Sequence, residues 1–209
     1  MEINERNFIK LIRRDISSKL VHLTKSTEGF QAIDVLDKII TENKIIGGTG
    51  FIKSHEQCIC FSETPLTEIA NLLKVNEVTS QSGLRPRYEA YGVVVPKKWV
   101  WDQGARPVIY QPDLEYNILP NELKYRHVRY ELESDIDFTW EREWRLKVNE
   151  LILLPENTIF IVPTSEEVIY LKREYFSHMA MAVSSLGEDA LPYIEDFPWR
   201  IIPLDIFHE

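Results

Sequence analysis

Two glutamates two positions apart, Glu141 and Glu143, stand in the stretch WEREWRL, residues 140–146. Residues i and i+2 of an extended strand lie on the same face, so the pattern predicts that both carboxylates share one face with Arg145. Neighbouring carboxylates suit glycosyl transfer, because an oxocarbenium-like transition state needs a negative charge beside it. The plainer interpretation is a pair of carboxylates neutralised by Arg142 or Arg145.

Other polar side chains lie near the ends of expected strands, where binding clefts are commonly built. A neutral histidine and a hydroxyl can hold a ribose, and a tyrosine can pack on a flat ring. The residues that suit these roles are His22, Thr24, Ser62, Tyr91 and Tyr110. Each also has a structural explanation, such as a hydrogen-bonded histidine in a strand or a serine that caps the segment after Pro65.

Several common kinds of site are not indicated. Residues 45–54, IIGGTGFIKS, have neither the G-x-G-x-x-G nor the G-x-x-x-x-G-K-[ST] spacing, so Rossmann or P-loop nucleotide binding is not predicted. The histidines form no H-x-H or H-E-x-x-H pattern, and no metal site is expected. Cys58 and Cys60 are expected to be buried thiols in a reducing compartment.

Composition bounds the class of protein. The chain has 209 residues, 44% of them hydrophobic, which suffices for one full core. The net charge of −9 argues against broad nucleic-acid binding, although Arg85, Arg87, Lys97 and Lys98 lie close in sequence as an expected solvated face. The start lacks the features of a signal peptide and no apolar run could span a bilayer, so a cytoplasmic protein without a membrane contact is expected.

The candidate site residues must be positioned by short helices and strands that alternate along the chain. The pattern predicts a single α+β domain over residues 1–209, with a helix in residues 1–18 docked on a core of residues 19–209, and a mixed sheet of about six short strands with flanking helices. Expected strands cover residues 19–24, 57–64, 89–96, 107–111, 143–148 and 158–163. Expected helices cover residues 5–17, 28–43, 65–74, 119–134 and 165–176. Residues 76–87 are expected to be a loop, and residues 199–207 an edge strand or extended tail.

Four segments together resemble a bacterial abortive-infection family named AbiGi. They are LVHLT at 20–24, CICFSETPL at 58–66, YGVVVPKKWVWDQGARPVIY at 91–110 and WEREWRL at 140–146. The resemblance covers roughly residues 20–148. It implies a role in phage defence, in a toxin–antitoxin arrangement with a cognate toxin or antitoxin as partner, because the family is commonly named as the antitoxin half of a two-gene system.

A weaker resemblance is to the ADP-ribosyltransferase superfamily, whose members commonly show an H-Y-E or R-S-E arrangement. His22 matches the first element, Ser62 or Tyr91 the second, and Glu143 of the E-x-E pair with Glu141 the third. The first strand is similar to that of the DarT-like branch. FSET, residues 61–64, departs from the S-T-S of the well-known toxins, so the choice between Ser62 and Tyr91 stays open.

The second resemblance implies an NAD-dependent transferase with an ADP-ribosyltransferase-like fold. NAD would be the co-substrate and the acceptor a macromolecule, either nucleic acid or protein. His22, with Thr24 beside it, would bind the adenosine ribose, and Tyr91 or Tyr110 would pack on nicotinamide. Glu143 would bind the nicotinamide ribose and stabilise the cationic transition state, while Glu141 would orient or deprotonate the acceptor.

The rival hypothesis is a non-catalytic antitoxin or partner-binding protein that keeps the same fold. In that case Glu141, Glu143 and Arg145 are salt-bridge partners within a sheet. A metal-dependent nuclease is less favoured, because the sequence shows no compact cluster of carboxylates and histidines. The transferase hypothesis requires His22 and Glu143 to converge on one cleft, so their placement on the sheet separates the alternatives.

Overall fold

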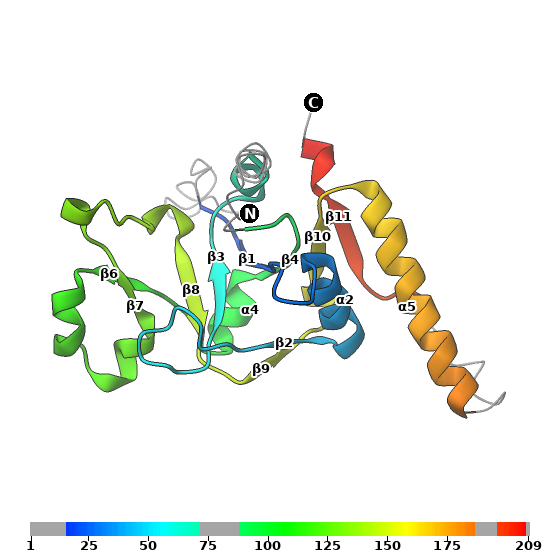
Figure 1. Ribbon diagram of the computed structural model, residues 1–209, viewed down its shortest axis with the longest axis horizontal. Helices are drawn as coiled ribbons and strands as arrows, with labels where there is room; N and C mark the ends of the chain where they lie inside the picture. Colours follow the sequence, from blue (N-terminus) through cyan, green and yellow to red (C-terminus); the bar gives the residue numbers. More distant parts are fainter. Residues whose placement is uncertain (1–15, 72–87, 187–195, 208–209) are drawn as a thin grey trace, which may run out of the picture. The chain divides into compact units, whose positions relative to one another are not determined.

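The computed structural model describes residues 16–71, 88–186 and 196–207. These residues form helices and a mixed seven-stranded sheet, so the predicted α+β class is confirmed (Figure 1). The described residues divide into two compact units: unit 1 comprises residues 16–22, 46–69 and 95–151, and unit 2 comprises residues 23–45, 70–71, 88–94, 152–186 and 196–207. The expected loop at 76–87 and almost all of the expected helix at 5–17 lie outside the described residues. The single-domain organisation stays a prediction.

Unit 1 is built on four neighbouring strands of the sheet in the order β1-β3-β8-β5. These strands are β1 (Lys19–Leu23), β3 (Ile59–Ser62), β8 (Glu143–Leu146) and β5 (Arg106–Pro107), and the pairs β1–β3, β3–β8 and β5–β8 are antiparallel. Burial alternates along β3, where Ile59 and Phe61 are buried while Cys60 and Ser62 are half-buried. This alternation means that the two faces of the sheet carry different side chains. The short helix α4 (Lys97–Asp102) also belongs to this unit.

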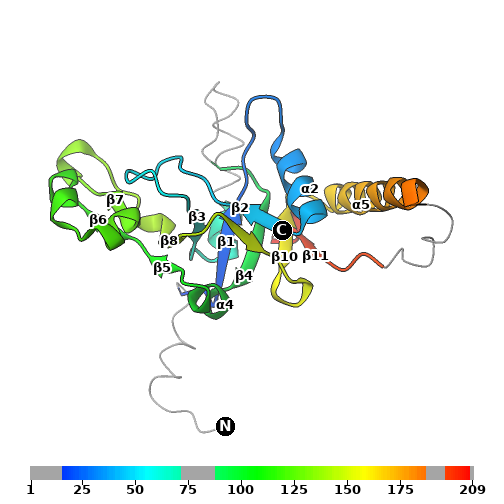
Figure 2. The same cartoon turned by 90° about the horizontal axis from the view of Figure 1, so that it is seen from below.

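A lobe of unit 1, residues 109–137, lies beyond β8 and β5 (Figure 2). It contains β6 (Ile109–Gln111), β7 (His127–Arg129), and the 3-10 helices η1 (Asp113–Ile118), η2 (Asn121–Arg126) and η3 (Leu132–Ser134). The predicted helix at 119–134 is therefore wrong. Residues 127–129 are extended because they pair with β6 in a parallel ladder, and that pairing ends η2.

Unit 2 contains three neighbouring strands of the sheet, in the order β11-β10-β4. The elements are β4 (Gly92–Pro96, of which residues 92–94 belong to this unit), β10 (Ile159–Val162) and β11 (Arg200–Pro203). β10 is antiparallel to β4 and parallel to β11. Nearly continuous burial along β4 and β10 matches their apolar sequences, since central strands covered on both faces need no alternation. The closing segment is confirmed as an edge strand, followed by η7 (Leu204–Phe207).

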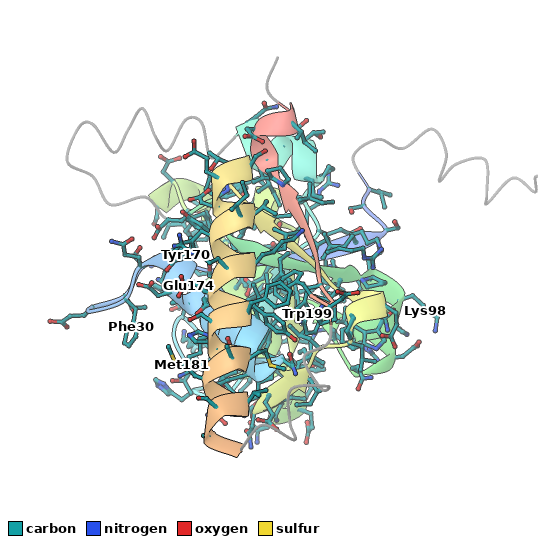
Figure 3. All side chains as sticks on the ribbon, turned by 90° about the vertical axis from the view of Figure 1, so that its right-hand side faces the viewer. Phe30, Lys98, Tyr170, Glu174, Met181 and Trp199 are labelled. Atoms are coloured by element: carbon teal, nitrogen blue, oxygen red, sulfur yellow. The ribbon has the colours of Figure 1, made fainter. Side chains whose placement is uncertain are left out.

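Two helices, α2 (Ala32–Glu42) and α5 (Ser165–Leu186), pack together in unit 2. α2 starts four residues later than predicted, and α5 continues ten residues beyond the predicted end. Figure 3 looks onto α5, along which Tyr170, Glu174 and Met181 lie, with Trp199 beside the helix. The strands β2 (Lys44–Ile46) and β9 (Glu150–Ile152) form a separate two-stranded sheet. Within the described ranges, no helix combines the length and the apolar character needed to cross a bilayer.

Candidate functional site

The residues before β8 form a single 3-10 turn, η4 (Thr139–Glu141), and not a strand. Arg142 follows in the left-handed region, with φ of 45°, and redirects the chain into β8. The expectation that Glu141 and Glu143 share one strand face is therefore wrong, because only Glu143 belongs to the strand. Glu141 lies in the turn and is 9% exposed.

Two hydroxyl groups at the end of β3 hold this turn in place. The Ser62 hydroxyl donates to the carbonyl of Glu141 at 2.7 Å, and the Thr64 hydroxyl donates to the carbonyl of Trp140 at 2.8 Å. The Ser62 oxygen also accepts the backbone N–H of Thr64 at 3.1 Å. Because the Ser62 hydroxyl is used both as donor and as acceptor, its observed role is to join the segment after β3 to the segment before β8.

The Glu143 carboxylate is bound to Arg145, two positions along β8. The guanidinium Nε and Nη2 donate to the two carboxylate oxygens at 2.7 and 3.2 Å. The Arg145 side chain is 4% exposed and that of Glu143 is 12% exposed. The remaining Nη1 donates to the carbonyls of Tyr125 and His127 at 2.6 and 3.0 Å, so this ion pair also ties β8 to the lobe.

Tyr110 and Cys60 are both neighbours of Glu143, Tyr110 through the backbone N–H and Cys60 through the carboxylate. The Tyr110 hydroxyl oxygen accepts the backbone N–H of Glu143 at 2.9 Å. Burial, the largest cause, raises the pKa of Tyr110 to about 12. Burial and the neighbouring Glu143 also raise the pKa of the Cys60 thiol, so both side chains are protonated at neutral pH. Ser62 and Glu143 are direct cross-strand partners, which places the hydroxyl, the tyrosine and the glutamate in one neighbourhood.

His22 has a structural role on β1. One ring nitrogen, Nδ1, lies 2.8 Å from the carbonyl of Cys60. A carbonyl oxygen only accepts, so Nδ1 carries the proton and the tautomer is fixed. Burial, the largest cause, lowers the pKa of His22 below its ordinary value of 6.5, so the ring is neutral at physiological pH.

The strand register separates His22 from Glu143. Val21 pairs with Ser62, so His22 stands opposite Phe61, and the two rings make an edge contact with centroids 6.0 Å apart. Ser62 pairs with Glu143 in the next ladder. Neighbouring residues of a strand point to opposite faces, and cross-strand partners point to the same face. His22 therefore lies on the Phe61 face and Glu143 on the Ser62 face, so the structure does not bring the two together on one side.

The face that carries Phe61 holds a polar group, centred on Glu63, that is not among the predicted site residues. The Trp144 indole donates to one Glu63 carboxylate oxygen at 2.8 Å, and the Lys97 ammonium contacts the other at 2.5 Å. Alternation along β3 places Glu63 on this face, but no spacing in the sequence connects it to Lys97, the first residue of α4.

Thr24 and Tyr91 belong to unit 2 and are joined to each other. The Thr24 N–H donates to the carbonyl of Tyr91 at 2.8 Å, and the Thr24 hydroxyl lies 3.2 Å from the same oxygen. The Tyr91 hydroxyl donates to the carboxylate of Glu167 in α5. Burial, followed by that hydrogen bond, raises the pKa of Tyr91. Both residues thus have structural partners within their own unit.

No protein-family model matches the chain, and no curated protein and no solved structure matches it. The two families named above therefore stay resemblances, and the NAD co-substrate, the phage-defence role and the cytoplasmic location stay predictions. Among the described residues, no three His, Cys, Asp or Glu side chains are grouped as metal ligands.

The predicted residues do not fit NAD in the way the resemblance implies. The Ser62 hydroxyl is occupied by backbone groups, both Glu143 oxygens are bound by Arg145, and His22 lies on the other face. A glutamate that stabilises a cationic transition state has to present its charge to the substrate, whereas a bound guanidinium neutralises that charge.

Proposed function

We propose that this chain is a non-catalytic, partner-binding protein of a two-gene abortive-infection system. The observation that carries the proposal is the buried ion pair between Glu143 and Arg145. In the transferase arrangement Glu143 must be available to a ribose hydroxyl. Here its carboxylate has a structural partner, and breaking a buried ion pair costs about 3–5 kcal/mol. The resemblance of residues 20–148 to AbiGi proteins supplies the biological setting.

The placement of the other predicted residues supports the same proposal. Ser62, Tyr110 and His22 each make a hydrogen bond to the backbone of unit 1. Side chains that satisfy backbone groups in this way stabilise the fold, since buried polar groups without partners are costly. On this proposal the polar strand ends maintain a scaffold, and the function lies on an exposed surface that contacts another protein.

The test combines turnover with complex formation. The purified chain is incubated with NAD, and nicotinamide release is followed by chromatography for the wild type, for Glu143→Gln and for Glu150→Gln, an exposed control. We expect no release above background from any of the three. Co-expression with the product of the adjacent gene is expected to yield a complex that co-elutes in size-exclusion chromatography. Nicotinamide release that Glu143→Gln alone abolishes overturns the proposal.

An NAD-dependent transferase is the second candidate function, and one observation favours it. Ser62 and Glu143 are cross-strand partners, and Tyr110 accepts the Glu143 N–H. A serine and a glutamate therefore occur together, as the second and third elements of an R-S-E arrangement do, with Tyr110 beside them. Of the two alternatives for the second element, Ser62 is the neighbour of Glu143. This candidate requires Glu143 to exchange Arg145 for a substrate. The nicotinamide assay above decides between the two functions.

A further inference from the structure

The lobe of residues 109–137 exposes three large aliphatic side chains. Leu114 is 90% exposed, Ile118 80% and Leu132 66%. The first two lie on η1 and the third on η3, and the backbone N–H of Asp113 donates to the carboxylate of Glu131 at 3.1 Å. That bond joins the start of η1 to the residue before Leu132. Several exposed aliphatic side chains in one small lobe form a surface of the kind that marks protein contacts.

The loop that carries Leu132 has a fixed conformation. Glu131 and Ile136 exchange two backbone hydrogen bonds, each of 2.9 Å, which close the loop. Asp135 takes the left-handed conformation, with φ of 55°, between them. Leu132 and its neighbours are thus presented by a hydrogen-bonded turn. A preformed surface loses less conformational entropy on binding than a mobile one.

The lobe is rich in acidic residues. Residues 113–137 contain seven carboxylates and three lysines or arginines. Arg129 is paired with Glu131, and the Lys124 ammonium lies over the Tyr116 ring at 5.3 Å. The carboxylates on exposed residues of this stretch are Glu115, Glu122, Glu133, Asp135 and Asp137. The lobe therefore combines exposed aliphatic side chains with exposed carboxylates.

We propose that Leu114, Ile118 and Leu132 form a docking surface for a basic amphipathic segment of a protein partner. The inference rests on the proposed function, which supplies the partner, and adds where it binds and what its chemistry is. Aliphatic side chains of that segment cover the three exposed residues, and its lysines or arginines pair with the exposed carboxylates of the lobe. A second copy of the chain carries the same carboxylates and a net charge of −9, so charge repulsion disfavours self-association at this surface.

The experiment uses the full chain and a synthetic helix-forming peptide of leucine and lysine, with a leucine–glutamate peptide of the same length as its matched opposite. Binding is measured by fluorescence anisotropy of the labelled peptide at low and at physiological salt. We expect the lysine peptide to bind and the glutamate peptide not to bind. The triple variant combines Leu114→Ser, Ile118→Ser and Leu132→Ser. We expect the triple variant to weaken the peptide affinity by about tenfold or more. Glu115→Lys with Glu133→Lys has a similar effect and reduces the salt dependence.

Phe51→Ser is the control, because Phe51 is 92% exposed in the same unit but outside the lobe. It leaves the peptide affinity unchanged, and all variants keep the wild-type circular dichroism spectrum and urea midpoint. Equal binding of the two peptides, or an equal loss with Phe51→Ser, overturns the docking surface. So does self-association of the wild type that the triple variant abolishes. A complex with the adjacent gene product that survives the triple variant overturns this surface but leaves the proposed function standing.

Discussion

Arg145 and Glu143 face each other two positions apart on β8, joined by two hydrogen bonds of 2.7 and 3.2 Å with both side chains largely withdrawn from water. The Arg145 guanidinium also donates to two backbone carbonyl groups of the lobe, so this side chain connects β8 to the lobe. Four predictions about stability follow from this and from neighbouring interactions.

Arg145→Met is expected to lower the free energy of unfolding by about 3–5 kcal/mol, because it leaves the Glu143 carboxylate buried without its partner. The double variant, with Glu143→Leu added, is expected to regain part of the lost free energy of unfolding, because it buries neither charge. Urea denaturation of the single and double variants measures this coupling. Lys38→Met is the control, as Lys38 pairs with Glu42 on an exposed helix face and its loss costs under about 0.5 kcal/mol. Equal effects of Arg145→Met and Lys38→Met would contradict the prediction.

Ser62→Ala and Thr64→Val each remove a hydroxyl that holds η4 against the end of β3. Each is expected to destabilise the protein by about 1 kcal/mol, which is the usual net value of such a hydrogen bond. The same urea titration measures the change. Ser184→Ala, on the exposed side of α5, serves as the comparison and is expected to have no measurable effect. A neutral Ser62→Ala would mean that the hydroxyl does not hold the turn.

Trp144→Phe keeps an aromatic ring but removes the indole donor to Glu63. The carboxylate then retains Lys97 but loses its second partner, and we expect a loss of about 1–3 kcal/mol. Trp101→Phe, at a ring that is 44% exposed, is the matched aromatic control and costs less. Thermal unfolding followed by circular dichroism ranks the two variants, and the reverse order would refute the assignment of Glu63 as the indole acceptor.

Stability is expected to fall as the pH drops below about 6.5, in part because of His127. Burial is the largest cause that lowers its pKa below the ordinary value of 6.5, and its Nε2 is buried with no hydrogen-bond partner among the described residues. The unfolded chain therefore binds a proton in a pH range where the folded chain does not, so acid favours unfolding. One such proton gives a slope of up to about 1.4 kcal/mol per pH unit.

His127→Asn removes this titration, although it leaves a smaller side chain. The urea-derived free energy of unfolding, measured at several pH values from neutral to mildly acidic, is expected to depend less on pH in the variant than in the wild type. Part of the slope remains, because His22 has the same direction of pKa shift. An unchanged slope in the variant would exclude His127 as a contributor.

The strands were predictable from their apolar residues. TIFIVP at 158–163 is a nearly continuous apolar run and EWRLKV at 143–148 alternates charged with apolar residues, and both contain the strands expected of them. The helix expected at 119–134 was not predictable in this way. The local sequence pattern there favours a helix, but residues 127–129 instead pair with β6, and that pairing is a tertiary interaction.

The candidate site illustrates the same limit at the level of single residues. Alternation correctly places Glu143 and Arg145 on one face, and an ion pair between them was one of the open interpretations. The placement of Glu141 depends on the left-handed backbone of Arg142 and on hydroxyls from residues 62 and 64, which no local pattern reveals. Whether His22 and Glu143 meet depends on the register of three strands, and register is decided by packing across the whole sheet.

The raised pKa values of two thiols, Cys58 just before β3 and Cys60 within it, have a practical consequence. Burial raises the pKa of Cys58 to about 11 and raises that of Cys60 as well, so neither side chain supplies much thiolate at neutral pH. Alkylating reagents attack the thiolate and need access to it. Cys58 is 4% exposed, so its labelling requires the surrounding structure to open. The rate at which Cys58 is labelled, followed by mass spectrometry, therefore reports how often this part of unit 1 opens under native conditions.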